Sequence, residues 1–229
     1  MVLSTKTVSR SKSLHEQTYK ALRESILNGD LAAGDRLIET QIAEQLQVSR
    51  TPIREAIRQL QREDLITADE LGWLRVTSVS PTEAMHLYDC RMALETLAVT
   101  SACQNATDSQ LKKLKSLVAQ VEKLFKQQDN PSSSQLLELD YQFHRTIAQY
   151  SGNNYLVFLL DQIFAKMALL RVQTMHHNPR VLEIRTEHQL LMEAIASRNI
   201  EVATQAIQSH LMASKFRVVQ ELENIQQQE

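Results

Sequence analysis

Glycine and proline are both scarce in this sequence, which has only 4 of each among its 229 residues. Sheet-rich folds and long loops use these two residues in their turns. Their scarcity therefore predicts long helices and argues against a protein built mainly of β-sheet. Hydrophobic residues make up 43% of the chain, which is enough to fill a core, and the length predicts one or two domains.

Cysteine is almost absent as well, since only Cys90 and Cys103 occur. If one helix carries both, they lie roughly 20 Å apart, which is too far for a disulfide. No stretch approaches the ~20 apolar residues of a membrane span, and the first 13 residues lack the apolar core of a signal peptide. The sequence therefore predicts a reduced, cytoplasmic protein without a membrane segment.

An excess of charge of one sign is also missing, because 25 basic residues face 27 acidic ones and the formal net charge is -2. This balance excludes a histone-like coat of positive charge. A local basic patch remains compatible with it.

The residue pattern changes near residue 80 and predicts two domains, residues 10–79 and 80–229. The first has short periodic segments and ends in two predicted strands, residues 65–67 and 74–79. The second opens on Ser80-Pro81-Thr82-Glu83, which is typical of a capping box at a helix start. Five later breaks predict six helices in this domain, near residues 105–107, 130–131, 151–153, 178–179 and 198–199.

Two short amphipathic segments with a tight connection lie between residues 39 and 60. Val48 is expected to be a buried plug in the connection, and Ser49 to cap the second segment. The pattern predicts a helix-turn-helix, and the strands that follow it would form a β-hairpin wing. The apolar stripes are, in chain order, Ile42, Ala43 and Leu46, then Ile53, Ile57 and Leu60.

Arginine recurs every fourth residue along the second segment, from Arg50 to Arg62, so four guanidinium groups stack on one helix face. A helix that presents its first turn to the major groove could use them to bind guanine or phosphate. The alternative is a solvated charged face, with Glu55 among the nearby partners. The turn, the polar first turn and the wing together favour DNA binding. The predicted DNA-contacting residues are Ser49, Arg50, Thr51, Arg54 and Arg58.

The stretch VSRTPIREAIRQL, residues 48–60, resembles the winged helix-turn-helix of bacterial transcription regulators of the GntR family. The resemblance covers roughly residues 14–79 and implies DNA contacts at Ser49, Arg50, Thr51 and Arg54. Two features depart from the family pattern. Thr40 stands where some members carry a DNA-contacting arginine, and the wing tip at residues 69–73 is acidic rather than basic.

Four polar residues interrupt the apolar stripes of three predicted helices in the second domain. A buried carboxylate or imidazole is unfavourable unless it is paired or bound to metal. Taken singly, each histidine is better explained as a hydrogen-bonded core residue, whereas together they suit a divalent metal, with Zn²⁺ favoured and Ni²⁺ or Mn²⁺ as alternatives. The predicted ligands are Asp140, His144, His188 and His210.

The order of the motifs at residues 91–95, 140–144, 187–188 and 210 resembles the FCD ligand-binding domain of the FadR branch of the GntR family. In metal-binding members of that branch, the corresponding aspartate and histidines hold the metal, and six helices are similar to the smaller VanR-type group. Arg91 is predicted either to bind an organic-acid effector or to pair with Glu95. Arg171 and Asn178 are weaker effector-binding candidates.

The expected fold is therefore mainly α, with an N-terminal winged helix-turn-helix, a small β-hairpin wing and a C-terminal all-α bundle of six helices. The expected function is a homodimeric transcription regulator, most simply a repressor, that binds palindromic double-stranded operator DNA and responds to a small carboxylate effector. An enzyme using the metal is one alternative, but the sequence shows no nucleophile motif or paired general base. A sensor of the metal itself is another.

Overall fold

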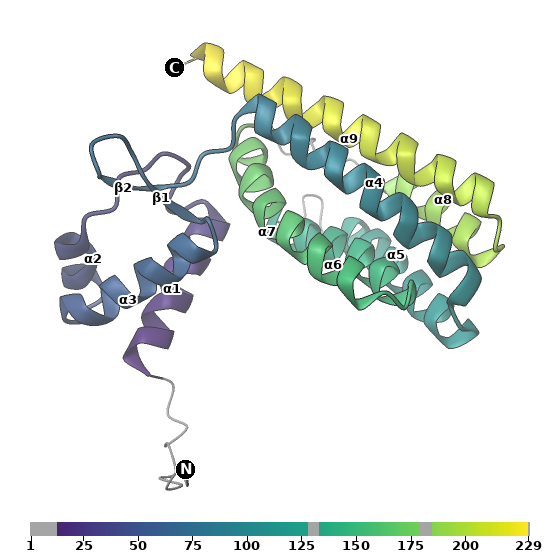
Figure 1. Cartoon of the computed structure of the whole chain (residues 1–229), viewed down its shortest axis with the longest axis horizontal. Helices are drawn as coiled ribbons and strands as arrows, with labels where there is room; N and C mark the ends of the chain where they lie inside the picture. The colour runs from purple at the N-terminus through teal and green to yellow at the C-terminus, as the bar shows by residue number, and fades with distance from the viewer. Residues whose placement is uncertain (1–12, 128–132, 179–184, 229) are drawn as a thin grey trace, which may run out of the picture. The chain divides into compact units, whose positions relative to one another are not determined.

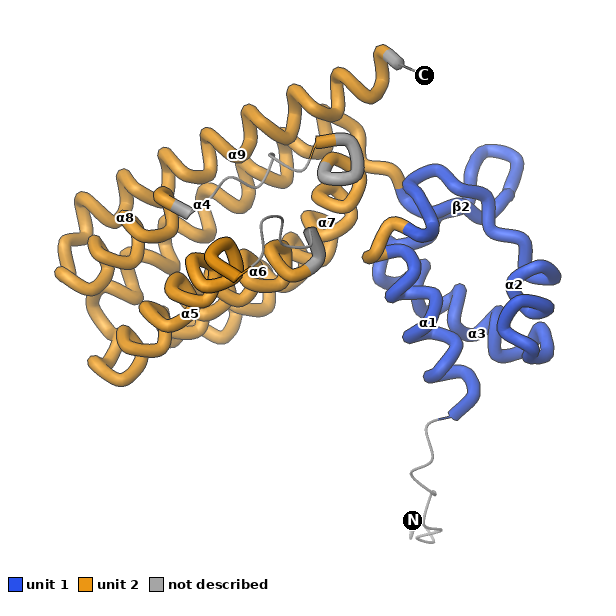
Figure 2. Tube along the Cα trace, turned by 180° about the vertical axis from the view of Figure 1, so that it is seen from behind, with its two compact units in different colours: residues 1–26, 30–77 blue, residues 27–29, 78–229 orange. Residues whose placement is uncertain are grey.

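The computed structural model describes residues 13–127, 133–178 and 185–228. Contacts divide them into two compact units (Figure 2). One unit contains the described residues up to Ile26 together with Asp30–Thr77, and the other contains Leu27–Gly29 and Ser78 onward. The predicted first domain begins at residue 10, which lies outside the described residues.

Within the described residues, the smaller unit consists of three helices and a two-stranded sheet (Figure 1). Its helices are α1 (Leu14–Asn28), α2 (Glu39–Gln45) and α3 (Arg50–Arg62), and its strands are β1 (Ile66–Ala68) and β2 (Leu74–Val76). The strands pair antiparallel, with Thr67 opposite Arg75. The hairpin turns at Gly72, whose φ of +78° is a conformation that glycine adopts without steric cost. The predicted wing is thus present. Strand β1 has the predicted length but begins one residue later, and β2 ends at Val76 rather than at residue 79.

The core of this unit forms along the buried face of α3, where Ile53, Ile57 and Leu60 are all at most 2% exposed. The prediction for α2 was wrong in part. Leu46 is 37% exposed and Val48 is only half-buried. Because α2 ends at Gln45, Leu46 is its C-cap and lies outside the regular helical stripe.

The larger unit is a bundle of six helices within the described residues, as the sequence predicted. They are α4 (Pro81–Asn105), α5 (Asp108–Gln127), α6 (Ser133–Tyr150), α7 (Asn154–His177), α8 (Arg185–Ala196) and α9 (Ile200–Gln228). The long helices α4 and α9 lie side by side (Figure 1). None of the helices in the described part of the chain combines the length and apolar character that a membrane crossing requires.

A local signal fixes the start of α4, and a tertiary contact stabilises its end. The Ser80 side chain accepts a hydrogen bond from the Glu83 amide, and the Glu83 carboxylate accepts one from the Ser80 amide, so the predicted capping box is present. At the other end, the guanidinium of Arg198 donates to the carbonyls of Cys103 at 2.9 Å and Ala106 at 2.6 Å. These bonds satisfy carbonyls that have no partner within the helix.

The core of the bundle brings together apolar residues from all six helices. Val99, Leu114, Leu160 and Leu211 are 0% exposed, as are several alanines. Helix α4 also buries Arg91 and Glu95 in this interior. The bundle therefore contains a polar centre enclosed by an apolar core.

Candidate functional site

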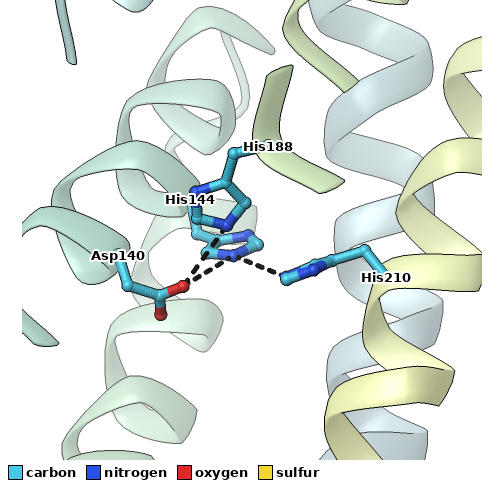
Figure 3. A group of neighbouring side chains, drawn as sticks. All are labelled: Asp140, His144, His188 and His210. Carbon is cyan, nitrogen blue, oxygen red and sulfur yellow. Dashed lines mark hydrogen bonds and ion pairs between the residues drawn. The ribbon is translucent and has the colours of Figure 1, made fainter. Parts of the chain in front are cut away.

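A cluster of four buried side chains lies inside the bundle, where α6, α8 and α9 meet (Figure 3). Asp140 and His144 lie one turn apart on α6, so both point to the same side of that helix. His188 comes from α8 and His210 from α9. All four residues are at most 2% exposed. The structure thus brings together the four residues that the sequence predicted as metal ligands.

The potential ligand atoms of these residues all lie within 4.8 Å of one another. Oδ1 of Asp140 is 3.5 Å from Nε2 of His144 and 3.3 Å from Nε2 of His188. The Nε2 atoms of His144 and His210 are 3.2 Å apart. Metal-ligand bonds of about 2.1 Å in a tetrahedron place neighbouring ligand atoms about 3.4 Å apart, so this spacing suits one small cation.

Hydrogen bonding within the cluster also fits a cation. Oδ1 of Asp140 and Nε2 of His188 are buried and lie 3.3 Å apart, but neither atom makes a well-formed hydrogen bond among the described residues. A buried polar atom without a partner is unfavourable by about 1–3 kcal/mol. A divalent metal bound by these atoms would remove that penalty.

Two glutamates contact two of the imidazoles at Nδ1, the ring nitrogen that does not belong to the cluster. Nδ1 of His144 lies 2.5 Å from Oε2 of Glu95, and Nδ1 of His210 lies 2.8 Å from Oε2 of Glu187. If each Nδ1 donates its hydrogen to the carboxylate, the Nε2 lone pair faces the cluster, which is the tautomer that binds metal. Arg217 in turn donates to both carboxylate oxygens of Glu187 at 3.2 Å.

The remaining two residues are held differently. Oδ2 of Asp140 accepts a hydrogen bond from Nη1 of Arg171, which leaves Oδ1 facing the histidines. The ring of His188 stacks on Phe143, with 4.1 Å between centroids and 20° between planes. Each of the four cluster residues therefore has a partner that fixes its orientation.

The acidic groups around the cluster are strongly stabilised in their charged form. Burial raises the pKa of Asp140, but Arg171 and His144 outweigh it and hold that pKa well below its usual range. Burial opposes ionisation of Glu95 too, yet Arg91 and His144 lower its pKa to about 2. Negative charge is thus maintained beside the imidazoles, as a cation site requires.

His188 and His210 are kept neutral by their surroundings. Burial lowers the pKa of His210 to about 3, although the hydrogen bond with Glu187 acts in the opposite direction. Burial also lowers the pKa of His188 from 6.5. Neutral imidazole is the form that binds a metal, so no proton has to be removed from these two rings first.

These shifts predict that acid destabilises the metal-free protein. The folded pKa of His210, about 3, lies below the ordinary histidine value of 6.5, so the unfolded chain binds more protons as the pH falls through 6.5. The lowered pKa values of Glu95 and Glu187 add a further loss below about pH 4.5. Urea unfolding of metal-free protein should show a falling free energy of unfolding from pH 7.5 to pH 4. A flat profile over that range would contradict this account of the buried groups.

Arg91 lies beside the cluster and is completely buried. Its Nε donates to Glu95, which confirms the pairing that the sequence offered as one alternative. Its carbon Cζ is 5.8 Å from the ring centroid of Tyr88 and 5.5 Å from that of Phe164. The two terminal nitrogens have no hydrogen-bond partner among the described residues. They remain available to an anion, so the pairing with Glu95 does not exclude the other alternative.

The two weaker effector candidates differ in position. Arg171 contacts Asp140 directly, and its Nε has no hydrogen-bond partner among the described residues. Asn178 is the C-cap of α7, and its side-chain Nδ2 donates to Glu221 of α9 at 3.1 Å. Arg171 therefore contacts a residue of the cluster, whereas this bond of Asn178 is made to a residue outside it.

The predicted DNA-contacting residues lie at the start and along the exposed face of α3. Ser49, Arg50, Thr51, Arg54 and Arg58 are all exposed. Ser49 is the N-cap residue, but its side chain makes no capping hydrogen bond, contrary to the prediction. Arg50 and Arg54 both donate to Glu39 at the start of α2 rather than to Glu55. Because Ser49 is exposed and makes no capping bond, its hydroxyl is not used by the start of α3.

Sequence reasoning missed several of these partners. Glu187 lies in the motif at residues 187–188, in which the sequence predicts only His188 as a ligand, and the sequence offers Glu95 only as a partner of Arg91. Position alone does not reveal that Glu95 reaches His144, because 49 residues separate them. The i, i+4 spacing of Arg91 and Glu95 predicts their ion pair, and this pair is the part of the network that the sequence could indicate.

Comparison with known proteins identifies both units. Residues 14–70 match the family model of the bacterial regulatory proteins of the gntR family, and residues 86–213 match the FCD domain model. The uncharacterized HTH-type transcriptional regulator YdhC of Bacillus subtilis (strain 168) is 30% identical over 85% of this chain and 86% of its own length.

Two further proteins match this chain over similar shares of its length. The HTH-type transcriptional repressor NanR of Klebsiella aerogenes is 27% identical over 87% of this chain and 83% of its own. The solved structure of McbR/YncC from E. coli superposes with a TM-score of 0.68 and 25% identity, covering 87% of this chain and 94% of that one. The likeness in each case extends over both units.

Proposed function

Because this chain belongs to the GntR family of bacterial regulatory proteins and contains an FCD domain, we propose that it is a cytoplasmic transcription repressor controlled by a small carboxylate. The family consists of transcription regulators, so the chain is not an enzyme. In the proposal, residues 10–79 form the DNA-binding domain and residues 80–229 form the effector domain. The observation that carries the proposal is the convergence of four buried ligand atoms in the effector domain.

The DNA-binding part of the proposal assigns operator recognition to the first two turns of α3. Arg50 and Arg54 are exposed there, with Ser49 and Thr51 beside them. Arginine can bind guanine through two hydrogen bonds, and hydroxyl groups can bind phosphate oxygens. One such helix reads only a short half-site. We therefore propose a homodimer that binds a palindromic operator through two copies of α3.

The effector part of the proposal assigns a divalent metal to Asp140, His144, His188 and His210. Three nitrogen donors and one oxygen donor suit Zn²⁺, with Ni²⁺ and Mn²⁺ as alternatives. The bound ion would act as a Lewis acid that accepts a carboxylate oxygen from the effector at a further coordination position. The protein itself would supply four buried ligand side chains whose orientations are already fixed by their partners.

Arg91 supplies the second half of the proposed effector site. Its free terminal nitrogens can form two parallel hydrogen bonds with a carboxylate, which is the strongest geometry for that pair. Arg171 would add positive charge beside Asp140. The class of ligand is therefore a small organic acid. The relative NanR is named a repressor, and we propose for this chain repression that the ligand relieves.

Effector binding would change operator affinity by a coupling free energy of about 1–3 kcal/mol, the usual range for such regulators. A metal sensor is the competing function, and the buried metal-binding geometry is what favours it. The two differ in one measurement. If metal alone switches operator affinity and no carboxylate does, the chain is a metal sensor.

Arg50→Ala is expected to weaken operator binding by at least about 1 kcal/mol, since one base or phosphate contact is lost. The measurement is a gel shift at fixed salt with a duplex selected from random sequences by the wild-type protein. Lys20→Ala is a suitable control, because Lys20 lies on α1 and pairs with Glu16. Unchanged affinity of the Arg50→Ala variant would remove α3 as the reading helix.

A further inference from the structure

Glu39 occupies an unexpected position on the proposed DNA-binding surface. It is the first residue of α2, and its Oε2 accepts hydrogen bonds from Nε of Arg54 at 2.8 Å and from Nη2 of Arg50 at 3.1 Å. Its side chain is 24% exposed, whereas those of Arg50 and Arg54 are 54% and 52% exposed. One carboxylate therefore contacts both of the arginines nearest the start of α3.

The local structure keeps this carboxylate in place and charged. A negative side chain in the first turn of a helix interacts favourably with the helix dipole. Burial raises the pKa of Glu39, but hydrogen bonds from Arg54 and Arg50 outweigh this effect and lower it. Ion pairs at the surface contribute only about 0–1 kcal/mol to stability. Stability alone is therefore a weak reason for a carboxylate among arginines that face DNA.

The hydrogen bonds leave different donors free on the two arginines. Arg54 uses Nε for Glu39, and among the described residues its terminal nitrogens show no hydrogen bond. Arg50 uses Nη2 for Glu39, and its other nitrogens show none within the same part of the chain. Guanine offers two acceptors, O6 and N7, and a guanidinium with two free terminal nitrogens can bind both at once. A phosphate also accepts paired hydrogen bonds from a guanidinium, but binding to phosphates of any sequence depends strongly on the net positive charge of the protein surface.

We propose that Glu39 is a positioning residue that sets sequence selectivity, by holding Arg54 and Arg50 in an orientation that suits bases and by weakening their attraction to phosphates of any sequence. This inference rests on the proposed recognition role of α3. Glu39 acts through the two arginines and does not itself contact DNA.

The test compares the full-length Glu39→Gln variant with wild type on two duplexes of equal length. One is selected from random sequences by the wild-type protein, and the other is a scrambled sequence of the same composition. Fluorescence anisotropy at several salt concentrations gives both affinities and their salt dependence. Glutamine keeps the size of the side chain and removes the charge, so the fold is preserved.

The Glu39→Gln variant is expected to bind the scrambled duplex several-fold more tightly. Its selectivity, the ratio of the two affinities, should fall about tenfold, which corresponds to ~1.4 kcal/mol. The slope of log affinity against log salt for the scrambled duplex should steepen by about 1, because one more cationic side chain is free to neutralise a phosphate. A residue with a merely structural role would change neither the selectivity nor the slope.

Glu44→Gln is the matched control. Glu44 is an exposed glutamate on the same helix α2, and removing its charge changes the net charge by the same amount. The proposal is overturned if this control lowers selectivity as much as Glu39→Gln, or if Glu39→Gln changes both affinities by one common factor. It is also overturned if Glu39→Gln still changes selectivity when Arg50 and Arg54 are both replaced by alanine.

The experiment distinguishes failure of the proposed recognition role of α3 from failure of the inference about Glu39. If Arg50→Ala and Arg54→Ala each bind the selected duplex as tightly as wild type, α3 does not read the operator and the inference about Glu39 falls with it. If those variants lose affinity while Glu39→Gln keeps the wild-type selectivity, only the inference about Glu39 fails.

Discussion

Purified protein is expected to contain about one divalent metal ion per chain, and a His144→Ala/His188→Ala double variant is expected to contain almost none. The double variant removes two of the four donors that converge in the cluster. With only Asp140 and His210 left, the site falls below the three or four protein ligands that zinc sites use. The metal content is therefore expected to fall from about one ion per chain to almost none.

Elemental analysis of protein purified without chelator measures the content directly, and it also decides between zinc, nickel and manganese. His86→Ala is a matched control, since His86 is exposed on α4 and outside the cluster. A wild-type protein that stays metal-free in medium supplied with all three ions would refute the metal assignment. The four residues would then be explained as a hydrogen-bonded polar core.

Metal binding should also stabilise the fold. A ligand that binds only the folded state at 100 times its dissociation constant adds about 2.7 kcal/mol. The melting temperature of the wild type is therefore expected to fall on chelation and to recover when metal is added back. The double variant should show neither change, which separates loss of the site from general damage.

Arg91→Met is expected to lower the free energy of unfolding by about 3 kcal/mol or more. The change leaves the Glu95 carboxylate buried without the guanidinium that now pairs with it, and breaking a buried ion pair in this way typically costs ~3–5 kcal/mol. Arg145→Met is the matched comparison. Arg145 makes two hydrogen bonds to Asp161, but both side chains are about one-third exposed. Its replacement should cost about 1 kcal/mol or less.

Denaturant unfolding of the two variants beside wild type measures this difference. Equal losses for Arg91→Met and Arg145→Met would contradict the role given to burial.

Arg91→Lys tests effector binding separately, because lysine keeps the charge but lacks the paired terminal nitrogens. In metal-loaded protein, the rise in melting temperature caused by a panel of small di- and tricarboxylates should require at least tenfold more ligand in this variant. An unchanged response would remove Arg91 from the effector site.

Much of the fold could be predicted because its signals are local. The capping box at Ser80 and Glu83 lies within one helical turn, and the six-helix bundle follows from breaks that are visible in the sequence. The helix-turn-helix and the wing were also predictable from short patterns and from the family resemblance. Local patterns gave the wrong answer where a helix ended early, as at Leu46, or where a capping residue made no capping bond, as at Ser49.

The sequence by itself determined which residues are candidates for the proposed chemistry: histidines and an aspartate at helical spacing, and arginines along one face of α3. Only the tertiary structure decided how they are partnered. Glu95 reaches His144, Glu187 reaches His210, and Glu39 instead of Glu55 contacts the arginines. The physical reason is range: periodicity and capping depend on neighbours within about four residues, whereas these pairs join different helices and exist only once the helices pack.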